Sequence, residues 1–569
     1  MKISSFPCMA CIQPALLFCL VGLAQQPKPY HNTLPKDITV YHAAVVSANP
    51  LATAVGLRIL KEGGNAVDAA IAVQLTLAVV YPEAGNIGGG GFTVIHLNSG
   101  KNYTIDYREE APGKAYRDMF LDKQGNADPH LSQDGHLACG VPGTVAGLFA
   151  AYKFASLPFR ELIEPAIHLA RNGFAISAEE AKMLNDTRSD FLKLNTIRPV
   201  FVRHIPWKAG DTLIQKDLAH TLELIRDNGS AGFYGGETAK RIVKEMIRGG
   251  GMISSKDLLE YAVKWRNPLS FDYKKYVVLT MPLPSSGGIM LEQMLGMLSA
   301  YQVGKMGFET PQSVQLMTEI ERRCYADRAK FLGDPDFVKV PVKTLVSPEY
   351  LRQRMLNYSP GKATPSKDIQ AGKINPESEE TTQVSVLDSS GNAVSLTYTL
   401  NGLYGSRVVV GGAGFLLNNE MDDFSAKPGS PNMFGLVGAE ADAIAPHKRM
   451  LSSMTPTILL RKNHPFLIVG TPGGATIITS VFQSIVDLLD FHLSLFDAVN
   501  KPKFHEQWLP DLIYIEKGFP LQTRKALEKM GYRFKVREAI GRTEAIEVLP
   551  DGKIRAVADH RGDDSALGY

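Results

Sequence analysis

The sequence is poor in cysteine and in net charge, and both shortages exclude classes of protein. Only five cysteines occur in 569 residues, and Cys8, Cys11 and Cys19 lie near the N-terminus. The remaining pair, Cys139 and Cys324, provides neither a disulfide framework nor a metal-ligand spacing. Lys and Arg number 61 against 58 Asp and Glu, so the net charge of +3 does not indicate nucleic acid or an anionic membrane as a partner. With 44% hydrophobic residues, the chain has ample apolar material for a large globular core.

The N-terminal segment contains an apolar run that is too short to cross a bilayer. This run covers residues 15–23 after one early lysine, and Gly22 and Ala24 have the spacing that signal peptidase accepts. The pattern predicts a signal peptide over residues 1–24 and an exported protein, either periplasmic or secreted. One alternative is a frayed cytosolic tail, because two prolines interrupt the segment. Lipid attachment at Cys19 is a lesser alternative, because the residue before it is bulky.

The first two thirds of the chain have mainly helical periodicity. Apolar and small residues over 49–82 predict two buried helices that are broken at Gly63 and Gly64. Helical patterns also dominate residues 155–340. The glycine-rich stretch 85–92 predicts a tight turn that enters a strand, and since no Gly-Lys-Ser/Thr follows, it does not favour a phosphate-binding loop.

The periodicity changes to two after Thr381. A polar connector over residues 358–380 leads into segments that predict strands, followed by a helix near 477–489 and further strands towards the C-terminus. The first predicted strands after the connector are, in order, TQVSVLD, AVSLTYTL, SRVVVGGAGFLLNN, TPTILLR and FLIVGT.

The junction between Glu380 and Thr381 is suited to one specific reaction. If this peptide bond is cut, the new α-amine has an unperturbed pKa of about 7.7 to 8.0 and can accept the proton of the threonine's own hydroxyl. One residue then supplies both the nucleophile and the base. The alternative is that Thr381 and Thr382 simply begin a β-strand.

Several long segments occur in a fixed order around this junction. They are TIDYREEAPGKA, YADRAKFLGDPDFVKVP, TTQVSVLDSSGNAVSLTYTLNGLYGSRVVVGGAGFLLNNEMDDFSAKPG, KRMLSSMTPTILL, VGTPGGATIITS and FHEQWLPD. Together they closely resemble γ-glutamyltransferases, also called glutathione hydrolases, which are N-terminal nucleophile hydrolases. The resemblance implies an α+β fold, a four-layer αββα sandwich, without a cofactor or metal. It also implies a large subunit over residues 25–380 and a small subunit over 381–569, which remain partners after cleavage.

The same resemblance implies an activity. The protein would cut itself before Thr381 and then cleave γ-glutamyl amides, glutathione in particular, through a γ-glutamyl ester on that threonine. The ester would be resolved by water, an amino acid or a dipeptide. One alternative is a cephalosporin or glutaryl acylase, which would share the fold and the nucleophile. Another is a non-catalytic binding protein, which would not need the junction.

The resemblance assigns the catalytic residues by position. Thr381 is the nucleophile, and Thr399 is its hydrogen-bond partner in self-cleavage and in turnover. The backbone N–H groups of Gly473 and Gly474 form the oxyanion hole, where glycine lets the backbone approach the reacting carbonyl. Without the resemblance, these residues would be interpreted as a cross-strand pair and a turn.

The substrate-binding residues follow from the same resemblance. Arg108 holds the α-carboxylate, for which its planar guanidinium offers two parallel hydrogen bonds. An α-amino acid head also needs a cation site beside this anion site. The remaining residues are Ser452 and Ser453 for the α-carboxylate, and Asn401, Glu420 and Asp423 for the α-ammonium group. Each of them alone is more often a turn residue, a helix cap or a surface charge.

The chain departs from the family pattern at two positions. Gln383 stands where many relatives have histidine, which predicts slower processing. Residues 426–449 resemble the lid of bacterial relatives, but Phe434 stands where tyrosine is usual. Loss of that hydroxyl predicts a looser gate that favours water or larger acceptors.

Overall fold

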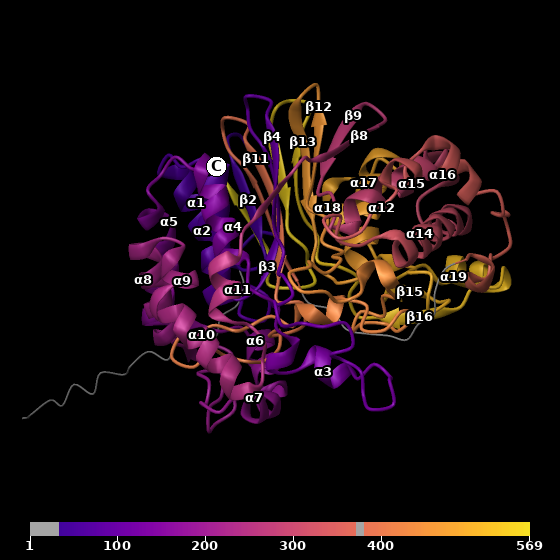
Figure 1. The fold of residues 1–569 in the computed structure, drawn as a ribbon. Helices are drawn as coiled ribbons and strands as arrows, with labels where there is room; N and C mark the ends of the chain where they lie inside the picture. The colour runs from indigo at the N-terminus through magenta and orange to yellow at the C-terminus, as the bar shows by residue number, and fades with distance from the viewer. Residues whose placement is uncertain (1–33, 371–380) are drawn as a thin grey trace, which may run out of the picture.

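Two seven-stranded antiparallel sheets lie face to face, with helices against both outer faces (Figure 1). The computed structural model describes residues 34–370 and 381–569. The predicted signal peptide over 1–24 and Glu380 therefore lie outside the described residues. The four layers confirm the predicted αββα sandwich.

The first sheet combines strands from both sides of the Glu380–Thr381 junction. Strand β10 begins directly after Thr381 and pairs with β2 on one side and β11 on the other. The strand that follows the predicted cut is therefore central in a sheet whose other strands come partly from before the cut. The order is β19 (Ser565–Gly568), β2 (Ala44–Ser47), β10 (Thr382–Leu387), β11 (Ala393–Thr399), β3 (Gly90–His96), β4 (Asn102–Tyr107) and β7 (Lys264–Arg266).

The second sheet is also built from both sides of the junction. Its inner face meets the first sheet in an apolar layer that includes Val46, Ile458 and Ile546. The order is β1 (Asp37–Val40), β18 (Ile554–Val557), β17 (Glu544–Val548), β13 (His464–Gly470), β12 (Thr457–Arg461), β9 (Tyr276–Thr280) and β8 (Leu269–Tyr273).

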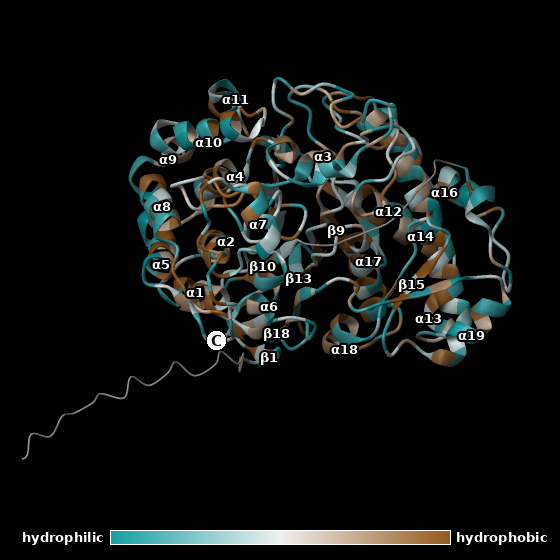
Figure 2. Ribbon diagram, turned by 90° about the horizontal axis from the view of Figure 1, so that it is seen from below, coloured by the Kyte–Doolittle hydropathy of each residue, from teal (hydrophilic) through white to brown (hydrophobic). Residues whose placement is uncertain are grey.

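One helical layer covers the first sheet. Helices α1 (Pro50–Lys61) and α2 (Ala66–Val80) confirm the predicted pair, and the break between them contains Gly63 and Gly64. Asn65 caps α2 in a capping box with Asp68. All residues of α2 are buried because α1 and α5 (Phe159–Asn172) pack on it, and Figure 2 shows it as mainly hydrophobic.

The other helical layer covers the second sheet. It contains α12 (Ser286–Leu298), α14 (Pro311–Phe331) and α17 (Thr476–Leu489), which share one apolar cluster with the outer face of that sheet. Helix α17 confirms the helix predicted near 477–489. The first residues of α12 and α17 lie close to the candidate site described below, so this layer contributes to the site as well as to the core.

Smaller elements complete the described chain. The remaining helices are α3 (Pro129–Gln133), α4 (Thr144–Ala151), α6 (Ala178–Asp186), α7 (Arg188–Leu194), α8 (Lys216–Asn228), α9 (Ala231–Tyr234), α10 (Gly236–Gly249), α11 (Ser255–Glu260), α13 (Val303–Met306), α15 (Val342–Leu345), α16 (Pro348–Arg354), α18 (Leu495–Asn500) and α19 (Leu521–Lys529). The remaining strands are β5 (Phe174–Ala175), β6 (Thr212–Leu213), β14 (Phe504–His505), β15 (Ile513–Glu516) and β16 (Phe534–Arg537). No helix in the ranges 34–370 and 381–569 is long and apolar enough to span a bilayer.

One predicted strand is wrong. The segment SRVVVGGAGFLLNN forms a folded-back loop with a single bridge between Val409 and Leu416. Positive φ angles at Asn401, Tyr404 and Arg407 turn the chain repeatedly just before and at the start of this segment. Such turns are incompatible with a continuous ladder, whatever the side-chain alternation.

Candidate active site

Thr381 and Thr399 lie together because neighbouring strands carry them. Thr381 directly precedes β10, and Thr399 is the last residue of β11. The Thr381 hydroxyl donates to the Thr399 hydroxyl oxygen at 3.4 Å, and the backbone N–H of Asn401 donates to the same oxygen at 2.8 Å. Only 4% of Thr381 is exposed. The pair is therefore buried and oriented, as a nucleophile and its partner would need to be.

A small cavity opens onto this pair. It brings together all the predicted site residues of the described chain except Gly473 and Glu420, which adjoin it through Gly474 and Arg108. The lining residues are Arg108, Thr381, Thr399, Asn401, Asp423, Phe434, Ser452, Ser453, Met454, Gly474 and Ile477.

Arg108 forms the charged centre of the cavity. Its side chain is 1% exposed, and its two terminal nitrogens lie 2.5 Å from Glu420 Oε2 and 2.5 Å from Asp423 Oδ2. The sequence predicted separate tasks for these groups, with Arg108 for a carboxylate and the acids for an ammonium group. The structure instead pairs them with each other, so the anion and cation sites are directly adjacent.

A third carboxyl group, that of Glu109, lies 3.6 Å from Arg108. Burial raises the pKa of Glu109 to about 8, although Arg108 opposes the shift. Burial also raises the pKa values of Glu420 and Asp423, again against the effect of Arg108. Because burial favours the neutral form of Glu109, it reduces the negative charge around the single guanidinium.

Ser452 and Ser453 form an extended segment along the cavity. The Ser452 N–H donates to the Pro284 carbonyl at 2.9 Å, and the Ser452 carbonyl accepts from both the N–H and the hydroxyl of Ser286 at 2.7 Å. Ser453 Oγ lies 3.4 Å from Arg328 Nη2. Sequence reasoning missed Ser286 and Arg328, although Arg328 stands in the quoted segment YADRAKFLGDPDFVKVP. A buried arginine has no sequence signal that separates it from an exposed one.

The Gly473–Gly474 turn leads into α17. Both residues have positive φ angles, 132° and 51°, which favour glycine. A Cβ atom on Gly474 would lie 2.5 Å from the ring of Phe434, so this turn and the lid are in direct contact. Within the described part of the chain, neither glycine N–H donates a hydrogen bond to the protein. Their role as an oxyanion hole stays a prediction.

The segment expected to be a lid, residues 426–449, borders the cavity through Phe434. Asn432 Nδ2 donates to Asp423 Oδ1 at 2.7 Å, and the backbone N–H of Met433 donates to Asp422 Oδ2 at 2.7 Å. Phe434 lines the cavity with its ring. Whether the absent hydroxyl loosens this gate stays a prediction.

Gln383 is buried between the sheets. Its side chain accepts from Thr397 Oγ1 at 2.6 Å and donates to Ser395 Oγ at 3.0 Å, both on β11. A Cβ atom on Gly470 of the opposite sheet would lie 2.2 Å from the Gln383 side chain, which shows how closely the two sheets approach here. Gln383 is therefore part of the polar packing between the sheets, and its effect on processing stays a prediction.

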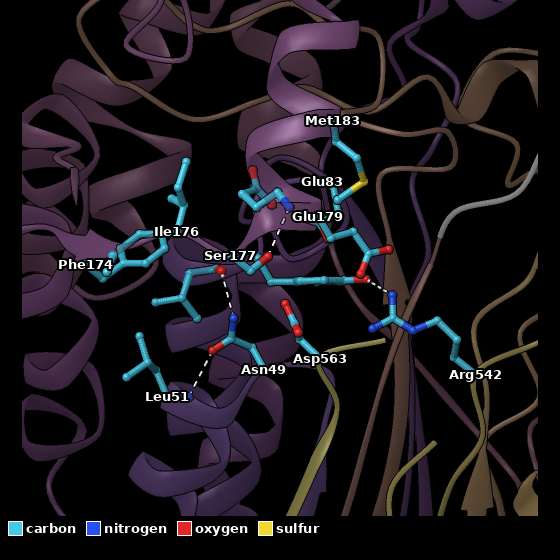
Figure 3. Close-up of a pocket in the computed structure, with 14 residues that line it drawn as sticks. Asn49, Leu51, Glu83, Phe174, Ile176, Ser177, Glu179, Met183, Arg542 and Asp563 are labelled. Atoms are coloured by element: carbon cyan, nitrogen blue, oxygen red, sulfur yellow. Dashed lines mark hydrogen bonds between the residues drawn. The ribbon is translucent and has the colours of Figure 1, made fainter. Parts of the chain in front are cut away.

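A second cavity lies away from these residues and contains none of them (Figure 3). Its buried Glu180 accepts from the Tyr404 hydroxyl at 2.9 Å, and the Tyr404 N–H donates to the carbonyl of Glu83. Arg542 closes another side through an ion pair with Asp564. The two Tyr404 contacts hold the loop that follows Asn401 against this cavity.

Replacing Thr399 with alanine should slow both self-cleavage and turnover. The variant removes the oxygen that contacts the Thr381 hydroxyl and the Asn401 N–H, and one such hydrogen bond corresponds to a rate loss on the order of tenfold. Pulse-labelled maturation and kcat would measure the two effects. Thr399→Ser restores the oxygen and should recover both rates. Normal rates in the alanine variant would leave Thr399 with a packing role only.

The folded region is similar over most of its length to one group of known proteins. The family described as gamma-glutamyltranspeptidase matches residues 52–569. The glutathione hydrolase proenzyme of Escherichia coli (strain K12) is 48% identical over 530 residues, which cover 92% of this chain and 91% of that protein.

Two solved structures are also similar. The gamma-glutamyltranspeptidase of Helicobacter pylori is 46% identical with a TM-score of 0.56, over 57% of this chain and 94% of the solved chain. The cephalosporin acylase from Bacillus halodurans has a TM-score of 0.80 at 24% identity, over 96% of this chain and 99% of that chain, which shows a shared fold alone. The family match and the identity to the E. coli protein decide the assignment: this chain belongs to the gamma-glutamyltranspeptidase family.

Proposed function

We propose that this protein is a self-processing γ-glutamyltransferase and glutathione hydrolase. The observation that carries the proposal is that Thr381 and Thr399 line the same cavity as the Arg108–Asp423 pair. A nucleophile beside adjacent cation and anion sites fits an acyl donor that ends in an α-amino acid head. A γ-glutamyl group is such a donor.

The substrate head would be held by groups of both charges. Its α-carboxylate would bind Arg108 and the two serines, Ser452 and Ser453, and its α-ammonium group would bind Asn401, Glu420 and Asp423. Arg108 already contacts both acids. The carboxylate and the ammonium group of the substrate would therefore bind beside an existing cluster of opposite charges. Opposite charges that lie next to each other in a buried site stabilise each other more than in water.

The chemistry would use both functions of Thr381. After cleavage of the Glu380–Thr381 bond, the free α-amine accepts the hydroxyl proton while Oγ1 attacks the γ-carbonyl carbon. The N–H groups of Gly473 and Gly474 would stabilise the oxyanion, and donors of this kind are worth roughly 3 kcal/mol each. The C–N bond then breaks, and the amine product leaves with the proton. Water, an amino acid or a dipeptide would resolve the ester by the reverse steps.

The processed protein would consist of residues 25–380 and 381–569 after removal of residues 1–24. Both sheets contain strands from both fragments, hydrogen-bonded to each other, which supports their remaining together after the cut. The signal-like pattern over 1–24 supports export to the periplasm or out of the cell.

The direct test uses glutathione and purified protein. We expect release of glutamate and cysteinylglycine, and formation of γ-glutamyl amino acid or γ-glutamyl dipeptide when an acceptor is added. Mass spectrometry of the products measures both routes. Release of neither product by fully processed protein would refute the proposal.

A further inference from the structure

Arg328 is a buried cation beside the cavity and outside the predicted site. It lies in the last turn of α14 and is 5% exposed. Its Nε donates to Ser286 Oγ at 3.0 Å, and its Nη2 donates to Ser453 Oγ at 3.4 Å. Ser286 in turn donates to the carbonyl oxygen of Ser452. Arg328 therefore contacts the Ser452–Ser453 segment at both residues, directly and through Ser286.

The charge of Arg328 has no partner at ion-pair distance. Within residues 34–370 and 381–569, no carboxylate oxygen lies within 4 Å of its guanidinium, and Asp423 and Asp442 act on it only from further away. The most deeply buried arginines all differ from it in this respect. They pair as Arg108 with Glu420, Arg322 with Glu506, Arg323 with Glu319 and Arg449 with Asp106.

An unpaired buried charge is costly, since desolvation disfavours the charged form. Burial accordingly lowers the pKa of Arg328, but a guanidinium stays protonated in proteins. Within the described residues, the positive charge thus lies behind Ser453, which lines the cavity, and has no carboxylate at ion-pair distance. Arg108, by contrast, already contacts two acids. An anionic ligand group beside Ser453 would compensate the charge of Arg328.

The hydrogen-bond direction also fits an anion. Because Ser453 Oγ accepts from Arg328, its own hydroxyl proton is available for another acceptor. A serine that accepts from a cation is a stronger donor, since hydrogen bonds in a chain polarise one another.

We propose that Arg328 is a positioning residue that makes the Ser452–Ser453 segment selective for acyl donors with a carboxylate. It orients Ser453 as a donor to that carboxylate and supplies the positive charge that Arg108 shares with Glu420 and Asp423. The inference rests on the proposed function, which gives the donor its α-carboxylate.

The test compares three anilides on each enzyme preparation. The γ-glutamyl anilide has both head groups, the glutaryl anilide has only the carboxylate, and the 4-aminobutyryl anilide has only the ammonium group. Arg328→Met should lower kcat/KM for the two carboxylate donors by on the order of 10- to 100-fold, as expected for hydrogen bonds to charged groups. The 4-aminobutyryl anilide should change by less than about twofold. Ratios within one preparation do not depend on its active fraction.

Two further variants separate positioning from general structure. Tyr325 lies one turn before Arg328 on α14, and its hydroxyl donates to the carbonyl of Ala475 beside the Gly473–Gly474 turn. Tyr325→Phe should therefore lower all three rates alike. Arg328→Lys keeps the charge and should retain part of the carboxylate preference. Arg328→Met should not lower the Tm, because it removes an unpaired buried charge.

Each result decides between the proposals. Equal losses on all three anilides in Arg328→Met would overturn the role of Arg328. If that variant does not mature, Arg328→Lys decides. A ratio of glutaryl to 4-aminobutyryl kcat/KM equal to that of the wild type would then overturn the role of Arg328. A wild type that does not prefer the γ-glutamyl anilide would refute the proposed function instead. The ratio of glutaryl to 4-aminobutyryl rates would still report on Arg328.

Discussion

Replacing Thr381 with alanine should leave one uncut chain without measurable activity, whereas the wild type should give two fragments. The same hydroxyl oxygen attacks the preceding peptide bond during maturation and the γ-carbonyl during turnover, so its loss abolishes both steps. In hydrolases, removal of the nucleophile costs on the order of 10⁶-fold in kcat. A denaturing gel shows the fragments, and N-terminal sequencing should find Thr381 at the start of the smaller one.

The adjacent threonine provides a matched control. Thr382 is the first residue of β10 and is fully buried, so Thr382→Val changes the same strand without removing the proposed nucleophile. This variant should still mature and turn over substrate. Sequencing of the larger wild-type fragment also tests the predicted cut after Ala24. Cleavage of the Thr381→Ala chain at the same bond would show that another group or another protein makes the cut.

The second large effect is expected in the choice between γ-glutamyl and glutaryl anilides, which differ only in the α-ammonium group. A glutaryl donor brings a carboxylate that competes for Arg108, but it lacks the ammonium group that would compensate Asp423 and Glu420. Sites with polar groups left unpaired can discriminate on the order of 10⁴-fold. We therefore expect the wild type to prefer the γ-glutamyl anilide in kcat/KM by a factor of that order.

Asp423→Asn should lose most of this preference, mainly by impairing the γ-glutamyl donor. The amide keeps the shape and can still accept from Asn432, but it lacks the charge. Asp422 is the control, because it is buried next in sequence and accepts from Ser132 and Met433. Asp422→Asn should keep the preference. Equal use of both anilides by the wild type would favour the acylase alternative, with Thr381 still the nucleophile.

Sequence reasoning predicted the elements in which local pattern and tertiary contacts agree. The two helices of residues 49–82 and the strands on either side of the turn after Leu387 are examples. The strand expected over SRVVVGGAGFLLNN failed because contacts of the loop, such as Val409 with Asn195 and Gly411 with Glu245, outweigh the alternation of side chains. Burial of charged residues on α14 was also invisible, since partners such as Glu319 and Arg323 satisfy each other only in the fold.

The site itself was located from long ordered motifs, and the cavity gathers most of the residues that these motifs marked. The direct pairing of Arg108 with Glu420 and Asp423 could not be predicted, because the motifs lie more than 300 residues apart and their relative placement depends on the sheets. Arg328 was missed for a related reason. Its significance lies in the absence of an ion-pair partner within the described chain, which a sequence does not display.

The pairing of strands from both sides of the junction within each sheet has a consequence for the lifetime of the cut protein. Strand β10 lies between β2 and β11, while β12 lies between β13 and β9, so neither fragment can leave without breaking ladders in both sheets. Once the Glu380–Thr381 bond is broken, refolding from separated fragments becomes a bimolecular reaction and slows on dilution. The durability of the cut enzyme would then be set by the height of its unfolding barrier, which is a kinetic property, more than by its equilibrium free energy of unfolding.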